Sequence, residues 1–372
     1  MAWQGDAVPF ARTYATSGAR DTMRYGLLLF LRAEDGTTGL GEASPVGPGS
    51  RSEVEVLARA LLALAPRLLA MDTAGSASVW SLPTTIAPVL RFGVETALLD
   101  LQGKALGCSV AALLGGQPRL IPVNALVAEE SPEAAAAQAT ALAALGFTSL
   151  KLKVALGTLE MDEAFVAAVR GGVGAAIRLR LDANGAWTVS EAVQAIRRLA
   201  QYGIEYVEQP VDGRDVGGMK TVRAAVPVPI AADESIASAE DAVRVLAEGA
   251  ADVLVVKAGR LGGLDRAIEV LRLAAEALTP AVVTSSLEAG VGLAAAAHLA
   301  ASLPSGPFAH GLATGLLLES DLLTSPVKPT AGMLAIPSGA GLGVQVDRRA
   351  LQRYAIDVSG SADTPGNPGP RR

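Results

Sequence analysis

The sequence predicts a parallel α/β barrel that carries a smaller α+β capping domain. Eight short β-rich runs alternate with alanine-rich helical runs from about residue 121 onward. The residues before them mix hairpin-like and helix-like patterns. The 372-residue chain, half of it hydrophobic, is longer than one core usually serves. We therefore expect a globular protein of two domains, or one large barrel with an accessory domain.

The capping domain is predicted over residues 1–120. Residues 26–46 have the pattern of two strands around a Glu-Asp-Gly turn, which indicates an antiparallel hairpin. Residues 52–70 and 91–107 place apolar residues at helical spacing. Short strand-like runs reappear in residues 325–358, so we expect this segment to return to the capping domain.

The barrel is predicted over residues 121–324. Its strand-like runs begin at residues 121, 149, 177, 205, 229, 252, 281 and 308. Helix-start signals lie between them: Ser131 precedes a first-turn proline, and Thr188 and Glu191 have the spacing of a capping box. Residues 359–372 are rich in Gly, Pro and Ser, so we expect a disordered tail there.

The composition argues against several classes of partner. The net charge is −6, and no basic run with interleaved aromatic residues indicates nucleic-acid binding. The most apolar stretch, residues 289–303, is shorter than the roughly 20 residues that cross a membrane. Cys108 is the only cysteine and the first residues lack a secretory signal, so we expect a cytoplasmic protein. A homo-oligomer is left open.

Charged residues recur at the ends of successive predicted strands. They are Lys151 and Lys153 on the second strand, Asp182 on the third, Glu208 on the fourth, Asp233 on the fifth and Lys257 on the sixth. From Lys153 onward the separations are 29, 26, 25 and 24 residues, one βα unit each. Because catalytic groups of parallel barrels lie at the carboxyl ends of the strands, we expect these side chains to share one site.

The three carboxylates at this register predict a metal site. Adjacent carboxylates without a compensating cation would raise one another's pKa and resist ionising together. A hard divalent cation resolves this conflict, and all-oxygen ligation favours Mg²⁺, with Mn²⁺ as a substitute. Lys151 and Lys153 lie on one face of their strand, since side chains alternate with a period of two. They are expected at the mouth of the barrel.

These residues resemble the enolase superfamily, in the subgroup typified by muconate-lactonising enzymes. The matching motifs are Lys151-Leu152-Lys153, Asp182-Ala183-Asn184, Glu208-Gln209-Pro210, Asp233-Glu234-Ser235 and Lys257 followed by Gly259-Arg260-Leu261-Gly262-Gly263. The resemblance implies a modified TIM-type (β/α)7β barrel, with a capping domain formed by the N-terminal region and the C-terminal return. It covers nearly the whole chain.

The resemblance also implies roles for the residues. Asp182, Glu208 and Asp233 would hold Mg²⁺, which binds the carboxylate of a small-molecule substrate and stabilises an enediolate. Lys153 would remove the proton α to that carboxylate. Lys257 would act as a second base or as a fixed positive charge, and Lys151 would lower the pKa of Lys153 as a neighbouring like charge.

The last strand ends resemble those of o-succinylbenzoate synthases, in residues 285–293 and 311–323. Ser285 and Ser286 could donate hydroxyl groups to a second carboxylate or carbonyl of the ligand, and Gly311 allows close backbone approach. Expected substrate-binding residues are Asn184, Ser285, Ser286, Glu288 and Gly311. Residues 43–52 have the composition of a flexible lid that closes over the substrate.

The implied reaction is the dehydration that yields o-succinylbenzoate in menaquinone synthesis, catalysed by a carbon-oxygen lyase. Two other functions are open at this point. One is an N-acylamino-acid racemase, in which Lys153 and Lys257 both exchange protons, or an enzyme with both activities. The other is a catalytically idle barrel that binds a ligand, which the intact set of Lys, Asp and Glu residues argues against.

Overall fold

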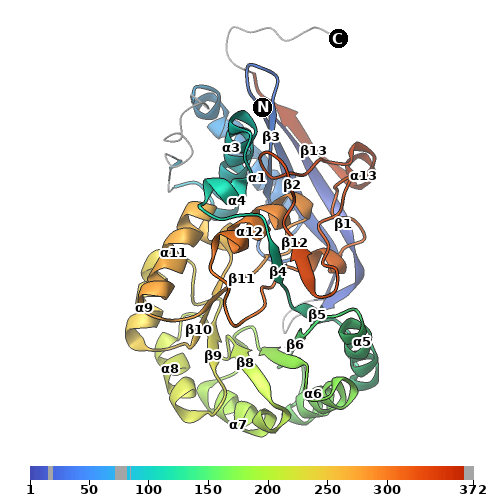
Figure 1. Ribbon diagram of the computed structural model, residues 1–372, viewed down its shortest axis with the longest axis vertical. Coiled ribbons are helices and arrows are strands. Elements are labelled where there is room, and N and C mark those ends of the chain that lie inside the picture. Colours follow the sequence, from blue (N-terminus) through green and yellow to red (C-terminus); the bar gives the residue numbers. More distant parts are fainter. Residues whose placement is uncertain (16–19, 72–81, 84, 364–372) are drawn as a thin grey trace.

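The structure, a computed structural model, describes residues 1–15, 20–71, 82–83 and 85–363. A parallel sheet curls into a barrel surrounded by helices, and an antiparallel sheet with its own helices lies against it (Figure 1). This arrangement confirms the predicted fold, an α/β barrel with an α+β capping region.

The capping sheet has the strand order β13-β1-β2-β3. Its strands are β1 (Ala2–Ala15), β2 (Arg20–Arg32), β3 (Thr38–Ala43) and β13 (Ala355–Ser361). The hairpin expected in residues 26–46 is present as β2 and β3. Strand β1 was not expected from the sequence, because its run contains both Gly5 and Pro9, residues that normally weaken a strand. Strands β13 and β1 come from opposite ends of the chain and lie side by side (Figure 1).

The helices of the capping region are α1 (Arg51–Leu69), α3 (Pro88–Leu106) and α4 (Val110–Leu113). The two longer helices are the ones expected in residues 52–70 and 91–107. Ser50 caps α1 by accepting a hydrogen bond from the Glu53 amide. Gly107 ends α3 with a φ of 68°, in the left-handed region that glycine adopts readily.

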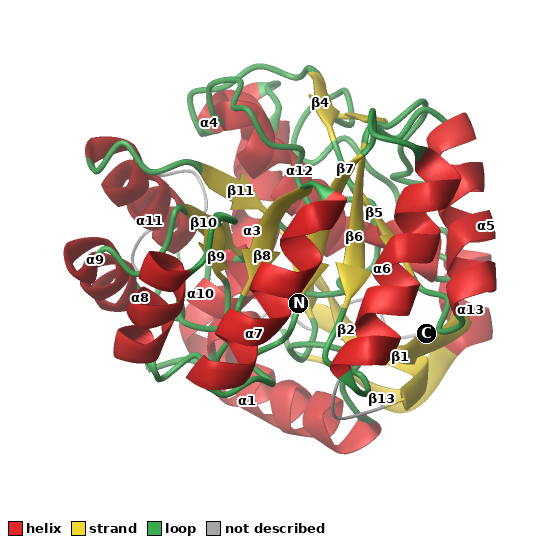
Figure 2. Cartoon of the chain, turned by 90° about the horizontal axis from the view of Figure 1, so that it is seen from below, coloured by secondary structure: helices red, strands yellow, loops and turns green. Residues whose placement is uncertain are grey.

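The barrel strands are adjacent in chain order, from β5 to β11. They are β5 (Ala125–Val127), β6 (Ser149–Lys153), β7 (Arg178–Asp182), β8 (Ile204–Glu208), β9 (Ile230–Ala232), β10 (Val253–Val256) and β11 (Ala281–Val283). The helices that follow them are α5 (Pro132–Ala144), α6 (Leu159–Val173), α7 (Val189–Leu199), α8 (Val216–Ala225), α9 (Ala239–Glu248), α10 (Ala258–Leu261), α11 (Leu264–Glu276) and α12 (Gly290–Ser302). The longer helices surround the strands (Figure 2).

In place of an eighth strand, residues 310 and 311 close the barrel through isolated parallel β-bridges to Val123 and Thr284. The His310 amide donates to Pro122 O at 2.8 Å, and the Asn124 amide donates to His310 O at 2.9 Å. On the other side, the Gly311 amide donates to Val283 O at 3.0 Å. A short 3₁₀ turn, η2 (Thr314–Leu317), follows these residues in place of a helix. Seven βα units closed by these bridges correspond to the expected (β/α)7β form.

The helix-start signals in the barrel act as expected. Ser131 accepts a hydrogen bond from the Ala134 amide at the start of α5. Thr188 and Glu191 form both hydrogen bonds of a capping box at the start of α7. Local sequence and tertiary structure therefore agree at these helices.

The C-terminal return differs from the expectation in two places. Strand β12 (Met333–Ala335) pairs with β4 (Leu120–Pro122), and only β13, after α13 (Arg348–Tyr354), joins the capping sheet. The prediction of a disordered tail from residue 359 is wrong for its first residues, because Ser359 to Ser361 belong to β13. Hydrogen bonds from β1 satisfy the backbone there, and Met1 and Ala362 also pair at 2.9 Å. Residues 364–372 lie outside the described residues.

In the part of the chain that the structure describes, no helix is both long enough and apolar enough to span a bilayer.

His310, which helps to close the barrel, is a buried titratable residue whose pKa affects the stability of the fold. Its Nδ1 accepts a hydrogen bond from the Val283 amide at 3.0 Å. Burial, and then the charges of Arg180 and Arg119, lower the pKa of His310 to about 4.

We expect the His310→Asn variant to lose less stability in acid than the wild type. An unfolded histidine binds a proton near pH 6.5, whereas folded His310 resists protonation down to about pH 4. The free energy of unfolding of the wild type therefore falls as the pH drops through this window, by about 2 kcal/mol at pH 5 from this residue. Asparagine retains an acceptor for Val283 and does not titrate. Urea unfolding at pH 7.5 and pH 5 measures the difference, and an equal fall in both proteins would contradict it.

Candidate active site

A pocket of about 200 Å³ opens at the carboxyl ends of the barrel strands. The capping region contributes Tyr14 from β1 and Val46, Gly47 and Pro48 from the segment before α1. The barrel contributes all of the charged side chains that line it. The segment expected to form a lid, residues 43–52, therefore borders the pocket, although its motion stays a prediction.

Lys151 lies between two of the predicted metal ligands. Its Nζ is 2.7 Å from Asp182 Oδ2 and 2.7 Å from Glu208 Oε1. The strand register causes this arrangement, because Asp182 pairs with Lys153 on β6 and with Glu208 on β8. Burial alone would lower the pKa of Lys151, but the carboxylates of Asp182 and Glu208 raise it well above its usual value. Lys151 is therefore held as an ammonium ion.

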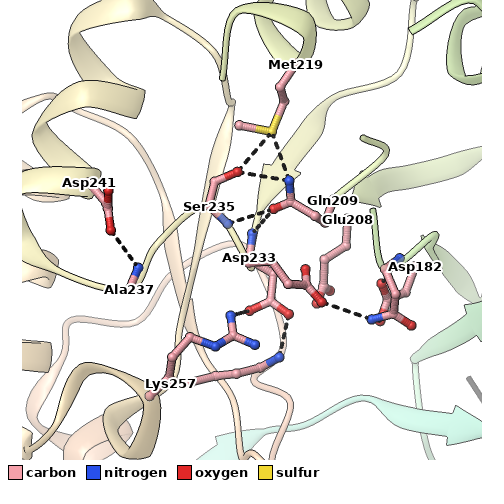
Figure 3. Close-up of polar contacts among 12 residues, drawn as sticks. Asp182, Glu208, Gln209, Met219, Asp233, Ser235, Ala237, Asp241 and Lys257 are labelled. Atoms are coloured by element: carbon pink, nitrogen blue, oxygen red, sulfur yellow. Dashed lines mark hydrogen bonds and ion pairs between the residues drawn. The ribbon is translucent and has the colours of Figure 1, made fainter. Parts of the chain in front are cut away.

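Asp233 is paired with two other cations. Lys257 Nζ contacts Asp233 Oδ2 (Figure 3). Arg260 Nη1 lies 2.7 Å from Asp233 Oδ1. Burial would raise the pKa of Asp233, yet the charges of Lys257 and Arg260 lower it below its usual range. Arg260 belongs to the motif Gly259-Arg260-Leu261-Gly262-Gly263, from which no role was expected for it, and it lines the pocket.

The compensation of charge is incomplete at Glu208. Burial raises the pKa of Glu208 to about 7, and the charges of Asp182 and Asp233 add to this effect against Lys151. A further cation among these carboxylates would favour their ionised forms. Three buried carboxylates with all-oxygen donors fit a hard divalent ion such as Mg²⁺. In the structure these carboxylates are paired with Lys and Arg side chains. Among the described residues, no three Asp, Glu, His or Cys side chains are close enough together to form a ligand set.

Lys153 lies in different surroundings from Lys151. Its Nζ donates to Asn184 Oδ1 at 2.9 Å and is 4.9 Å from the centre of the Tyr14 ring. Burial lowers the pKa of Lys153, and the like charge of Lys151 acts in the same direction. Asp182 opposes them. The expected influence of Lys151 is thus present, but desolvation is the larger cause.

Asn184 and Gln209 hold the strand ends in register. Both have positive φ angles, 45° and 39°, which are uncommon for residues other than glycine. The Asn184 amide group donates to Glu234 Oε1 at 3.2 Å while its oxygen faces Lys153. Gln209 Oε1 accepts from the backbone amides of Asp233 and Ser235 (Figure 3). Asn184, expected to bind substrate, thus also positions the side chain of Lys153.

The loop after β11 contains three of the expected substrate-binding residues. The Ser285 hydroxyl donates to Glu288 Oε2 at 2.8 Å, and the Ser286 amide donates to the same oxygen at 2.6 Å. Glu288 is therefore engaged within the loop and does not line the pocket. The Ser286 hydroxyl is buried without a partner, and Ser286 lines the pocket.

Gly311 lies where a side chain would not fit. A Cβ at this position would come within 2.6 Å of the Thr284 side chain, so this contact by itself requires glycine. The expected approach of a ligand to the Gly311 backbone stays a prediction. Gly311 also lines the pocket.

Several pocket residues were not identified from the sequence. They are Tyr14, Leu126, Tyr206, Glu234, Arg260, Thr284 and Thr314. Glu234 and Arg260 belong to motifs already quoted, so their position next to Asp233 and Lys257 was an available signal. No sequence pattern indicated Tyr14, because it lies on β1 of the capping region, a strand that was not expected from the sequence.

Comparisons with known proteins match both parts of the chain. The family model described as Enolase C-terminal domain-like matches residues 134–350. The model described as Mandelate racemase / muconate lactonizing enzyme, N-terminal domain, matches residues 7–115. The o-succinylbenzoate synthase of Thermobifida fusca (strain YX) is 47% identical over 255 residues, which cover 67% of this chain and 76% of that protein.

Solved structures are similar over almost the whole chain. The muconate lactonizing enzyme from Pseudomonas fluorescens, complexed with muconolactone, matches with a TM-score of 0.90 and 30% identity and covers 96% of this chain and 98% of its own. The dipeptide epimerase from Enterococcus faecalis V583, complexed with Mg and the dipeptide L-Leu-L-Tyr, matches with a TM-score of 0.84 and 30% identity. It covers 92% of this chain and 98% of its own.

We expect Mg²⁺ to stabilise the wild type against urea and to lose most of this effect in Glu208→Gln. A ligand that binds only the folded state adds about 2.7 kcal/mol at 100 times its dissociation constant. The variant removes one charged oxygen from the predicted ligand set.

The matched control is Asp162→Asn, which neutralises a buried carboxylate of α6 that binds the Ala155 amide away from the pocket. It should retain the magnesium effect. Equal stabilisation of Glu208→Gln and the wild type would contradict the assignment of the ligands, as would no stabilisation of the wild type.

Proposed function

Because the chain belongs to the enolase superfamily, in the subgroup typified by muconate-lactonising enzymes, we propose that it is an enzyme of the o-succinylbenzoate synthase type. The observation that carries this proposal is the 47% identity with the synthase of Thermobifida fusca. The substrate is then a cyclohexadiene carboxylate that bears a hydroxyl and a succinyl group. Loss of water gives o-succinylbenzoate, an intermediate of menaquinone synthesis.

Lys153 is the base of this reaction. Its lowered pKa favours the neutral amine, which can take the proton α to the substrate carboxylate. The electron pair of the broken C–H bond then displaces the hydroxyl group, as the C–O bond breaks and the ring becomes aromatic. Lys153 returns the same proton to the leaving hydroxyl, so water departs and the amine is regenerated.

Asp182, Glu208 and Asp233 would hold Mg²⁺, or Mn²⁺ as its substitute. When bound, the ion supplies Lewis-acid stabilisation of the negative charge that develops on the substrate carboxylate. Lys257 forms an ion pair with Asp233 and would add a fixed positive charge to the pocket. Asn184 orients the amine of Lys153 toward the pocket.

The end of the pocket formed by Thr284, Ser286 and Thr314 presents a polar but uncharged surface to the substrate. Thr284, Ser286 and Thr314 line it with hydroxyl groups that are buried and have no partner. No charged side chain of β11 or of residues 310–317 lines this end. Hydroxyl donors of this kind suit a carbonyl or carboxylate oxygen of a succinyl group.

Racemisation of N-acylamino acids is the second candidate function. The similarity to a dipeptide epimerase favours it, as does the presence of Lys257 in the same pocket as Lys153. In that reaction one lysine would remove the α proton and the other would deliver a proton to the opposite face.

One assay separates the two candidates. The enzyme, with Mg²⁺, is incubated with the cyclohexadiene precursor, whose absorbance is followed, and separately with N-succinyl amino acids, whose optical rotation is followed. We expect dehydration, and a decrease of about 10²- to 10⁴-fold in kcat for Lys153→Ala. Racemisation without dehydration would overturn the leading proposal. Full dehydratase activity in Lys153→Ala would overturn the mechanism.

We expect Lys151→Met to move the acid limb of the kcat/KM profile to higher pH, by about one unit. Activity requires neutral Lys153, so kcat/KM rises as the pH passes the pKa of this lysine. Removing the Lys151 ammonium removes a charge that lowers that pKa and leaves Asp182 and Glu208 to raise it. Lys151→Arg retains the charge and serves as the control. An unchanged limb in Lys151→Met, or a shift to lower pH, would contradict the role of Lys151.

A further inference from the structure

Three fully buried charged residues of the capping sheet lie against the loop after β11. Arg24 of β2 pairs with Asp6 of β1 at 2.5 Å and also contacts Glu42 of β3. All three side chains have 0% exposure. None of them lines the pocket, so they have no direct contact with a ligand there.

The same residues bind the backbone of the barrel loop. Arg24 Nε donates to Leu287 O at 3.1 Å. The two oxygens of Glu42 accept from the Ala289 amide at 2.6 Å and from the Gly292 amide at 2.8 Å. Every one of these bonds reaches a stretch of six residues, 287–292. Glu42 also supplies negative charge at the start of the 13-residue helix α12, where the helix dipole favours it.

This stretch includes a strained residue next to the pocket. Leu287 has a φ of 75°, which a leucine rarely adopts and which other contacts must maintain. Leu287 and Ser286 both line the pocket, and the Ser286 hydroxyl has no partner. The direction of that hydroxyl depends on the conformation of Leu287, because the two residues are adjacent.

We propose that Asp6, Arg24 and Glu42 are positioning residues that set substrate selectivity from the capping sheet. They hold residues 286–289 in the strained conformation, so that the Ser286 hydroxyl faces the part of the substrate remote from Lys153. This inference rests on the proposed function for the identity of the substrate. Loss of the triad should weaken binding of the succinyl end of the substrate and leave proton abstraction by Lys153 almost unchanged.

The main variant is Glu42→Gln, which retains the shape of the side chain and removes one acceptor oxygen and the charge. Arg24→Met is the second variant. If Arg24→Met does not fold, Glu42→Gln alone is used for the test. The control is Arg170→Met. Arg170 also binds backbone carbonyls, those of Gly174, Ile177, Tyr202 and Gly203, but it lies before β7 and β8 and away from the pocket.

Two measurements on the magnesium-loaded enzyme test the proposal. Hydrogen exchange followed by mass spectrometry should show amides of residues 284–293 exchanging about tenfold faster in Glu42→Gln, with β6 to β8 unchanged. KM for the cyclohexadiene precursor should rise about tenfold, with kcat changed less than about threefold. Arg170→Met should show neither effect.

Unchanged exchange in residues 284–293, or faster exchange spread over the whole barrel, would overturn the proposal. A fall in kcat at constant KM would also overturn it. If the wild type does not dehydrate the precursor, the proposed function fails, while the exchange experiment still decides whether the triad holds the loop.

Discussion

The structure depends on the burial of three carboxylates at adjacent strand ends. Asp182, Glu208 and Asp233 are almost inaccessible to water, so each requires a nearby cation. Lys151 forms ion pairs with Asp182 and Glu208, while Lys257 and Arg260 form ion pairs with Asp233. The raised pKa of Glu208 indicates that this compensation is incomplete, and the proposed divalent ion would complete it.

The same constraint separates two lysines that are only two residues apart on one strand. Lys151 faces two carboxylates that raise its pKa, whereas burial and the like charge of Lys151 lower the pKa of Lys153, which contacts the Asn184 amide and an aromatic ring. In the proposed mechanism, Lys153 would thus act as the base next to the carboxylates that would hold the metal ion. The ring is that of Tyr14, so the capping region takes part in this environment as well as in the support of the loop after β11.

The sequence predicted the features that follow from periodic local structure. The spacing of Lys153, Asp182 and Glu208 is one βα unit, and the parallel register then places them side by side. Tyr14 could not be predicted, because its approach depends on how two distant segments pack. Glu288 was expected to contact substrate, but the choice between the pocket and its own loop depends on backbone geometry that composition does not reveal.

The proposed mechanism requires that the pKa of Lys153 lies below the usual value for a lysine, while that of Lys151 lies well above it. The chain has only six lysines, so lysine ¹³Cε NMR can follow each of them through a pH titration. We predict that one resonance titrates below the usual value of about 10.4 and disappears in Lys153→Arg, and that another titrates well above that value. Six resonances that all titrate near the usual value would contradict the account.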